Sequence, residues 1–310
     1  MSLKSVGVIV IPDTGREFDH GAFEPTSGRV FVAHTAKDRL EVIDCASSRH
    51  MAALPGFHEA AGVVAEDGQV LVTNRGAAQL AWIDAHTLET KGTFETAVRP
   101  NGVALVTRRG LAVVACVGDD AAAPQLQVIA LGGQDRWALD LPGRPRWCVV
   151  DRAGQEVYVA IRHPSMVLAA RLPALSDVKQ WLLPSDGAHG LDIDHGNRLL
   201  YAACDGGALV ELDSSSGAVR AEWPLDGEPD ATFFNPSSGL VHVAIPEPGL
   251  VQSIHPRSGT ITRTITALGT QTTALIPPDR LYVFSPQHGG VLDLIEEAES
   301  PHSGIYKPRS

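Results

Sequence analysis

The chain reads DHGAFEPTSGRVFVAHTAKDRLEVID over residues 19–44, and this stretch decides the fold. It holds a short strand, a turn at Gly28, an apolar strand and a third strand that ends in Asp44, and the same order returns six times. The position of Gly21 recurs at residues 62, 102, 147, 190, 231 and 272, with spacings of 41, 40, 45, 43, 41 and 41. A period of this length, built from short strands and turn residues, is typical of a β-propeller.

The repeat predicts an all-β fold: a seven-bladed β-propeller with four-stranded antiparallel blades. Six copies carry a fourth strand, whereas the seventh ends at Ile295 without one. The strand at residues 6–11 is the only one left over, so we expect it to pair with residues 291–295 and close blade seven. Closure removes the exposed sheet edges that invite aggregation. Residues 1–298 are therefore predicted to form a single propeller, and residues 299–310 a C-terminal tail.

Composition limits the class of protein. The chain has 310 residues, of which 44% are hydrophobic and 20% charged, so it can bury a large core and is neither disordered nor a coiled coil. A formal net charge of −11 disfavours nucleic acid and anionic membranes as partners. The N-terminal apolar stretch is too short for a signal peptide, and the four cysteines are widely scattered. We expect a cytoplasmic monomer that acts on a small molecule.

The strands resemble those of the YVTN family of seven-bladed propellers. The segments that carry the resemblance are 29–33 (RVFVA), 40–44 (LEVID) and 100–105 (PNGVAL). The resemblance extends over nearly all of the chain and implies the seven-bladed fold. It implies no single function, because such propellers include lactonases, lyases and plain scaffolds.

Two sets of residues are expected to converge at one mouth of the central channel. One set directly precedes the innermost strand of each blade and comprises His20, Ala61, Asn101, Arg146, His189, Asp230 and Gln271. The other set lies at or just after the end of each second strand and includes His34, Arg162, His163, Asp205 and His288. Polar residues at a channel mouth could simply be solvated. Neutral imidazoles beside carboxylates, however, are the groups that a divalent metal requires.

The polar and charged residues of these two sets are assigned predicted roles. The metal ligands are His20, Asn101, His189 and Asp230. Imidazole favours zinc, manganese, iron or nickel, with magnesium also considered and calcium less suited. The catalytic groups are Arg146, His34 and His288. The substrate-binding groups are Arg162, His163, Asp205 and Gln271.

Two groups of propeller enzymes have a similar layout. Gluconolactonase-like propellers hold their metal with a Glu, an Asn and an Asp at the channel rim; Asn101 and Asp230 match in type, whereas His20 stands where the Glu is expected. Streptogramin lyases, which have rim histidines and a magnesium ion, are similar at His20-Gly21 and His189-Gly190. The resemblance implies a metal-dependent hydrolase or lyase, lactonase-like, that acts on a small carbonyl or carboxylate substrate.

Other functions stay open. One alternative is a non-catalytic propeller that binds a protein or a small ligand on one face. Another is a redox enzyme with a metal or quinone at the same mouth. The sequence has no Gly-x-Ser-x-Gly elbow, no phosphate-binding loop and no dinucleotide fingerprint, which disfavours a serine hydrolase, a nucleotide enzyme and a Rossmann oxidoreductase.

Overall fold

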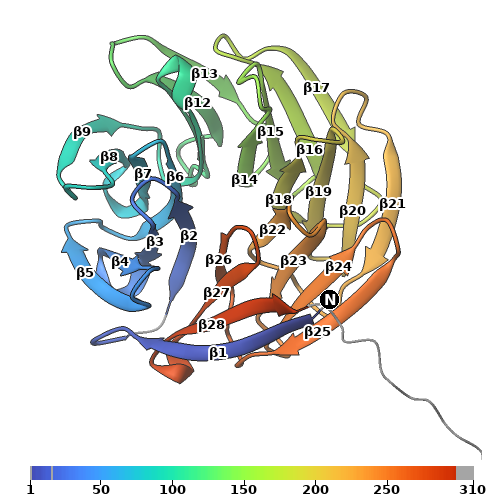
Figure 1. The fold of residues 1–310 in the computed structure, drawn as a ribbon. Coiled ribbons are helices and arrows are strands. Elements are labelled where there is room, and N and C mark those ends of the chain that lie inside the picture. The colour runs from blue at the N-terminus through green and yellow to red at the C-terminus, as the bar shows by residue number, and fades with distance from the viewer. Residues whose placement is uncertain (1, 15–16, 298–310) are drawn as a thin grey trace, which may run out of the picture.

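Seven four-stranded antiparallel sheets surround a central axis in the computed structural model, which describes residues 2–14 and 17–297 (Figure 1). Each sheet is one blade, and blades one to six take their four strands from consecutive segments of the chain. In the described residues the only helices are short 3-10 turns, η1 (Thr35–Lys37), η2 (Arg75–Ala77), η3 (Thr107–Arg109) and η4 (Pro286–His288). The predicted seven-bladed, four-stranded fold is confirmed.

Each blade has an inner, a second, a third and an outer strand, counted outward from the axis. The inner strands are β2 (Phe18–Glu24), β6 (Ala60–Glu66), β10 (Pro100–Val106), β14 (Pro145–Val150), β18 (Ala188–Asp194), β22 (Thr232–Asn235) and β26 (Thr272–Ile276). The second strands are β3 (Arg29–His34), β7 (Gln69–Asn74), β11 (Leu111–Cys116), β15 (Glu156–Ile161), β19 (Leu199–Cys204), β23 (Leu240–Ile245) and β27 (Arg280–Ser285). The third strands are β4 (Arg39–Asp44), β8 (Gln79–Asp84), β12 (Gln125–Ala130), β16 (Met166–Arg171), β20 (Ala208–Asp213), β24 (Leu250–His255) and β28 (Gly290–Glu297). The outer strands are β5 (Arg49–Pro55), β9 (Thr90–Glu95), β13 (Arg136–Asp140), β17 (Ser176–Leu182), β21 (Val219–Pro224), β25 (Thr260–Ile265) and β1 (Ser2–Val10).

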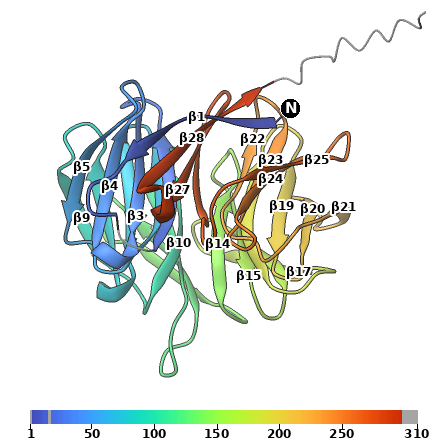
Figure 2. The same cartoon turned by 90° about the horizontal axis from the view of Figure 1, so that it is seen from below.

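The hydrophobic core is divided among the seven interfaces between blades. Each apolar cluster joins strands of two neighbouring blades, and the cluster of blades seven and one contains Ile9, Val30 and Phe284. Second strands are buried on both faces, so they read as continuous apolar runs. Outer strands such as β5 alternate between exposed and half-buried residues, because only one face of each meets a neighbour. Figure 2 shows the propeller from the side, turned by 90° from the view of Figure 1.

The N-terminal strand closes the ring as predicted. β1 pairs antiparallel with β28, with Val8 opposite Leu292 and Ile9 opposite Val291 (Figure 1). It begins at Ser2, four residues earlier than predicted. The polar residues before Val6 join the ladder because backbone pairing at an exposed edge requires no apolar side chain. Leu3 adds to the cluster between blades six and seven.

Some expectations are met and others lie outside the described part. Cys45, Cys116, Cys148 and Cys204 are all buried and free, as expected of reduced thiols. No helix in residues 2–14 and 17–297 is long and apolar enough to cross a membrane. The predicted tail at residues 299–310 falls outside the described residues.

Neighbouring inner strands approach each other closely where the repeat carries glycine. A Cβ atom at Gly62 would overlap the carbonyl oxygen of Asn101 in the next blade, and one at Gly190 would overlap the hydroxyl of Thr232. No side chain fits between the strands at these two positions, so the close approach there requires glycine.

We expect Gly62→Ala to lower the free energy of unfolding by about 1–3 kcal/mol, because the added methyl group must push two packed strands apart. Gly7→Ala is the matched control, since a Cβ atom there would meet no atom within 4 Å. Chemical unfolding of both variants beside the parent chain makes the comparison. Equal stability of the two variants would contradict the assignment.

Glu24 ties blade one to blade two. Its side chain is fully buried and accepts hydrogen bonds from the backbone N–H groups of Thr26 (3.1 Å), Ser27 (2.6 Å) and Gly68 (3.0 Å), the last in blade two. Burial raises the pKa of this carboxyl, but the hydrogen bonds from Gly68, Ser27 and Thr26 outweigh it and lower the pKa to about 2.

Glu24→Gln should cost about 1–3 kcal/mol of stability at neutral pH, because the charge that these donors stabilise is lost. A carboxyl with a lowered pKa stabilises the fold above its ordinary value of 4.5, and this contribution disappears as the pH falls towards 2. The stability gap between the parent and the variant should therefore shrink between pH 4.5 and 2, as unfolding in urea across that range would measure. A gap that is independent of pH would refute the role of the charge.

Candidate functional site

The rim residues leave the strand ladder through β-bulges. In blades one to five the pairing of the inner strand with the second strand shifts at its first residues. The shifts leave His20, Ala61, Asn101, Arg146 and His189 out of the regular register. A bulge turns its side chain away from the alternation of the strand. The inner strands can therefore aim these five side chains differently from the apolar residues that follow them.

Contacts between distant blades show that this end of the propeller converges. The His20 ring of blade one stacks on the indole of Trp147 of blade four, with ring centroids 3.8 Å apart and planes 3° from parallel. Blades one and four are not neighbours, so this stack crosses the axis. We call the residues joined here and below the rim cluster: Asp19, His20, Arg75, Asn101, Arg146, Trp147, Arg162, His189, Asp205 and Asp230.

One half of the rim cluster is centred on Asp19. Its Oδ1 atom lies 2.6 Å from Nδ1 of His20, and its Oδ2 atom accepts a hydrogen bond of 2.8 Å from Nη2 of Arg75. The same Nη2 atom donates to Oδ1 of Asn101 at 2.6 Å, and the Asn101 amide donates to the carbonyl oxygen of Arg146 at 2.9 Å. Blades one to four are thus joined in a single polar network.

The other half is centred on His189. Its Nδ1 atom lies 2.8 Å from Oδ1 of Asp205, whose Oδ2 atom accepts a 2.7 Å hydrogen bond from Nε of Arg162. Its Nε2 atom contacts the guanidinium of Arg146 and lies 3.6 Å from Oδ1 of Asp230. Burial opposes ionisation of Asp205, but His189 and Arg162 outweigh it and lower the pKa of this carboxyl. In both rim histidines the Nδ1 atom is thus hydrogen-bonded to an aspartate, Asp19 for His20 and Asp205 for His189.

The carboxylates of the cluster differ in acidity. Burial raises the pKa of Asp230, although the charges of His189 and His20 oppose the rise. Burial also acts on Asp19, but there the hydrogen bond and charge of His20, together with Arg75, hold the pKa well below its usual range. Two carboxyls whose pKa values are shifted in opposite directions can take different roles in one site, the first as a proton donor and the second as a fixed negative charge.

Five arginines gather at this end of an acidic chain. Burial lowers the pKa of Arg144, and the charges of Arg146, Arg162, Arg99 and Arg75 lower it further, so each of these four lies within electrostatic reach of Arg144. In the described part of the chain the side chains of Arg99 and Arg144 have no hydrogen-bond or ion-pair partner. Unpaired guanidiniums beside paired ones give the rim a local excess of positive charge that suits an anionic ligand.

Two predicted catalytic histidines lie apart from the rim cluster. His34 is fully buried, stacks on Phe18 with centroids 4.3 Å apart and bonds to Glu41 through Nδ1 at 2.7 Å. A substrate at the rim has no access to it, because the side chain lies within the blade interface. His288 is exposed on η4 and bonds to the hydroxyl of Ser285 at 2.8 Å.

Two predicted substrate-binding residues also stay outside the network. His163 is exposed, and within the described residues its side chain contacts none of the cluster. Gln271 donates to the carbonyl oxygen of Phe18 at 3.1 Å and lines a cavity of about 460 Å³ between blades seven and one. The other two predicted substrate-binding residues, Arg162 and Asp205, pair with each other within the rim cluster.

Four rim residues were missed by sequence reasoning. Asp19 precedes His20, and Arg75 follows the last residue of β7. Arg99 and Arg144 each stand directly before the proline that begins an inner strand, in blades three and four. The Arg-Pro pair that recurs at this repeat position is the sequence pattern that could have identified Arg99 and Arg144 as rim residues.

Comparisons with known proteins support the fold. No family model matches the chain, and no curated protein matches it in sequence. Hydrazine synthase of Kuenenia stuttgartiensis is similar in structure, with a TM-score of 0.79 and 12% identity over 92% of this chain and 99% of that one. A streptogramin B lyase structure has a TM-score of 0.76 and 11% identity over 94% and 97% of the two chains. These likenesses show a seven-bladed propeller, and membership of the YVTN family stays a prediction.

Two of the four predicted metal ligands, Asn101 and His189, already have an arginine at a donor atom. Asn101 Oδ1 accepts a hydrogen bond from Arg75, and His189 Nε2 contacts the guanidinium of Arg146. A metal ligand must direct a lone pair at the cation, and a nearby guanidinium opposes a second positive charge. Within residues 2–14 and 17–297 no group of three or more His, Cys, Asp or Glu side chains is arranged to hold a metal. As they lie here, Asn101 and His189 offer no free donor atom to the predicted metal.

We expect the purified protein to carry well below one zinc, manganese, iron, nickel or magnesium ion per chain, because Arg75 and Arg146 occupy the donor atoms of Asn101 and His189. Elemental analysis after dialysis against metal-free buffer measures this directly. Stoichiometric metal in the parent chain that is absent from His189→Ala would restore the sequence prediction. In that case the arginines would have to withdraw when the ion binds.

Proposed function

We propose that the rim cluster is the active site of a lyase that acts on a small carboxylate substrate, with hydrolysis of a carbonyl substrate as the second form of the same proposal. The observation that carries it is the pair of Asp–His units, both within electrostatic range of Asp230, with arginines nearby. An elimination needs a base, an acid and positive charge near the carbon that loses its proton, and the rim cluster offers all three.

His20 is the proposed general base. A carboxylate on Nδ1 holds the ring in the tautomer that leaves the Nε2 lone pair free to accept a proton. In the described residues no hydrogen-bond partner occupies Nε2 of His20, whereas Nε2 of His189 faces Arg146. The stack on Trp147 fixes the plane of the His20 ring.

Asp230 is the proposed general acid. Its raised pKa favours the protonated carboxyl, and it lies within electrostatic range of both histidines. Arg146 is the proposed partner of the substrate carboxylate, since a guanidinium binds carboxylate with two parallel hydrogen bonds. His189 and Asp205 would then be positioning residues, which hold Arg146 through the imidazole.

The proposed step balances without a further reactant. His20 removes a proton from the carbon next to the substrate carboxylate, and the electron pair of that C–H bond becomes a carbon–carbon double bond. The bond from the adjacent carbon to the leaving group breaks, and Asp230 donates its proton to the departing atom. The arginines stabilise the negative charge that develops on the carboxylate. For hydrolysis, His20 would instead deprotonate a water molecule that attacks a carbonyl.

Mass spectrometry of the products distinguishes the two forms. A panel of carboxylates with an ester, ether or amide leaving group two carbons away, together with lactones, is incubated with the protein. After elimination, the masses of the two products add up to the mass of the substrate. After hydrolysis, they add up to the mass of the substrate plus one water, and the added oxygen comes from the solvent. If panel members bind but all are recovered unchanged, the proposed catalysis is contradicted and the non-catalytic binding function is favoured.

His20→Gln should lower kcat at least about 100-fold, because glutamine keeps the shape of the side chain but has no proton-accepting nitrogen. His86→Gln is the matched control: His86 is an exposed histidine that bonds to Thr26 in the turns at the other end of the blades. The steady-state rates of both variants, with circular dichroism as a check on folding, test the assignment. Unchanged turnover in His20→Gln would remove this residue from the mechanism.

A further inference from the structure

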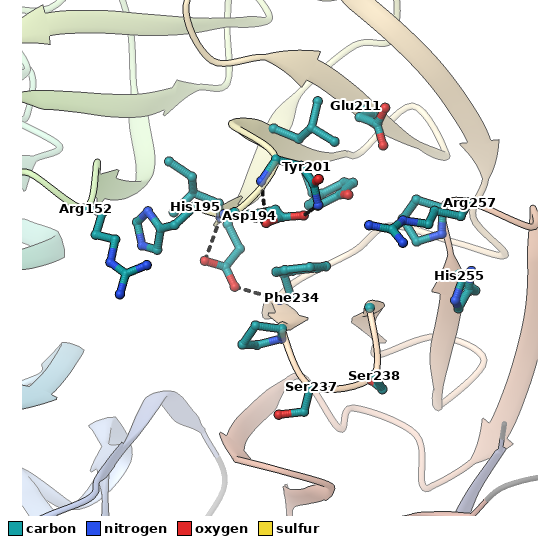
Figure 3. A pocket seen from close by; sticks show the side chains of 18 residues that line it. Arg152, Asp194, His195, Tyr201, Glu211, Phe234, Ser237, Ser238, His255 and Arg257 are labelled. Carbon is teal, nitrogen blue, oxygen red and sulfur yellow. Dashed lines mark hydrogen bonds between the residues drawn. The ribbon is translucent and has the colours of Figure 1, made fainter.

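We propose that a second ligand site, for an elongated organic dianion, lies between blades five and six at the other end of the propeller. A cavity of about 890 Å³ opens there, lined by the turns that follow β18, β22 and β24 and by Arg152 of blade four (Figure 3). This volume is in the range of small-molecule pockets.

The cavity is distinct from the rim cluster. β18 begins at Ala188, next to His189 of the rim, and ends at Asp194, whose neighbour His195 lines the cavity. A seven-residue strand separates the two by roughly 20 Å at about 3.3 Å per residue. None of the rim residues lines the cavity. A ligand held here is therefore a different molecule from the substrate proposed above.

Two arginines stand at opposite ends of the cavity. Figure 3 shows Arg152 beside His195 on one side of Phe234, and Arg257 with His255 on the other. In the described residues neither guanidinium has a hydrogen-bond or ion-pair partner. Both are turn residues with exposed side chains, so each can turn to an anion without losing an existing contact.

The acids in the cavity, by contrast, are already satisfied. Asp194 accepts hydrogen bonds from the N–H groups of Gly196 (2.8 Å) and Asn197 (3.0 Å) in its own turn. Asp192 accepts from the N–H of Phe234 at 2.6 Å, and burial raises its pKa to about 6. Glu211 is hydrogen-bonded to Tyr201, and burial raises its pKa as well.

Backbone N–H groups already occupy oxygens of Asp192 and Asp194, whereas the two guanidiniums have no partner within the described residues and are free to bind an anion. Aromatic and proline side chains also line the cavity between the two arginines. Phe234 stacks on Tyr201 with ring centroids 5.4 Å apart, and Pro236 and Pro256 line the walls beside them. A ligand with two anionic ends and a flat or apolar body would match both the charges and the middle. Neutral His195, whose pKa burial lowers, can add a hydrogen bond at the Arg152 end.

Titration calorimetry with the full chain tests the site. The probe is terephthalate, a flat molecule with a carboxylate at each end, and adipate serves as a flexible dianion of similar length. We expect at least one of the two to bind with a Kd below about 1 mM, and benzoate, with one carboxylate, to bind at least about tenfold more weakly. Binding should weaken as salt is added.

Variants locate the binding. Arg152→Gln and Arg257→Gln should each raise the Kd at least about tenfold, whereas Arg171→Gln, an exposed arginine outside the cavity, should leave it unchanged. Melting temperatures confirm that the variants fold. The proposal is overturned if neither dianion binds, if benzoate binds equally well, or if the affinity survives both variants. It is also overturned if Arg146→Gln abolishes binding, because the anion would then sit at the rim.

Discussion

The close approach of neighbouring inner strands is the constraint on which the rest of the structure depends. Inner strands of neighbouring blades approach so closely around the axis that in places their backbones leave no room for a side chain, as at Gly62 against Asn101. The same closeness brings rim residues of successive blades within hydrogen-bond reach, so that Asn101 bonds to the backbone of Arg146 and Arg146 contacts His189. The ring closure and the candidate site therefore have one physical origin.

Charge is distributed unevenly along the axis. The chain carries a net charge of −11, yet five arginines lie together at one end. Asp19 and Asp205 compensate some of them, and both carboxyls stay ionised because the paired cations outweigh burial. Arg99 and Arg144 remain for a ligand. Partial compensation of this kind limits the repulsion among the arginines and still leaves positive charge at the candidate site.

The candidate site could be predicted only in part. The repeat predicted that His20, Asn101 and His189 lie at one end of the ring, and in the structure each falls in the register shift at the start of its inner strand. It placed His34 beside them as well, and there the pairing of β3 with Phe18 puts the ring inside the blade interface. A strand end can face either the axis or the core, and which of the two applies depends on one residue of register.

The sequence by itself determined the number of blades, the strand order and the closure by the N-terminal strand, because period, turn residues and apolar runs are local properties of the chain. Only the tertiary structure decided which rim side chains meet. The stack of His20 on Trp147 joins residues more than a hundred positions apart, and the guanidinium of Arg146 takes the imidazole nitrogen that a metal would need. Bulges set the direction of these side chains, and a bulge depends on how two strands pair in space.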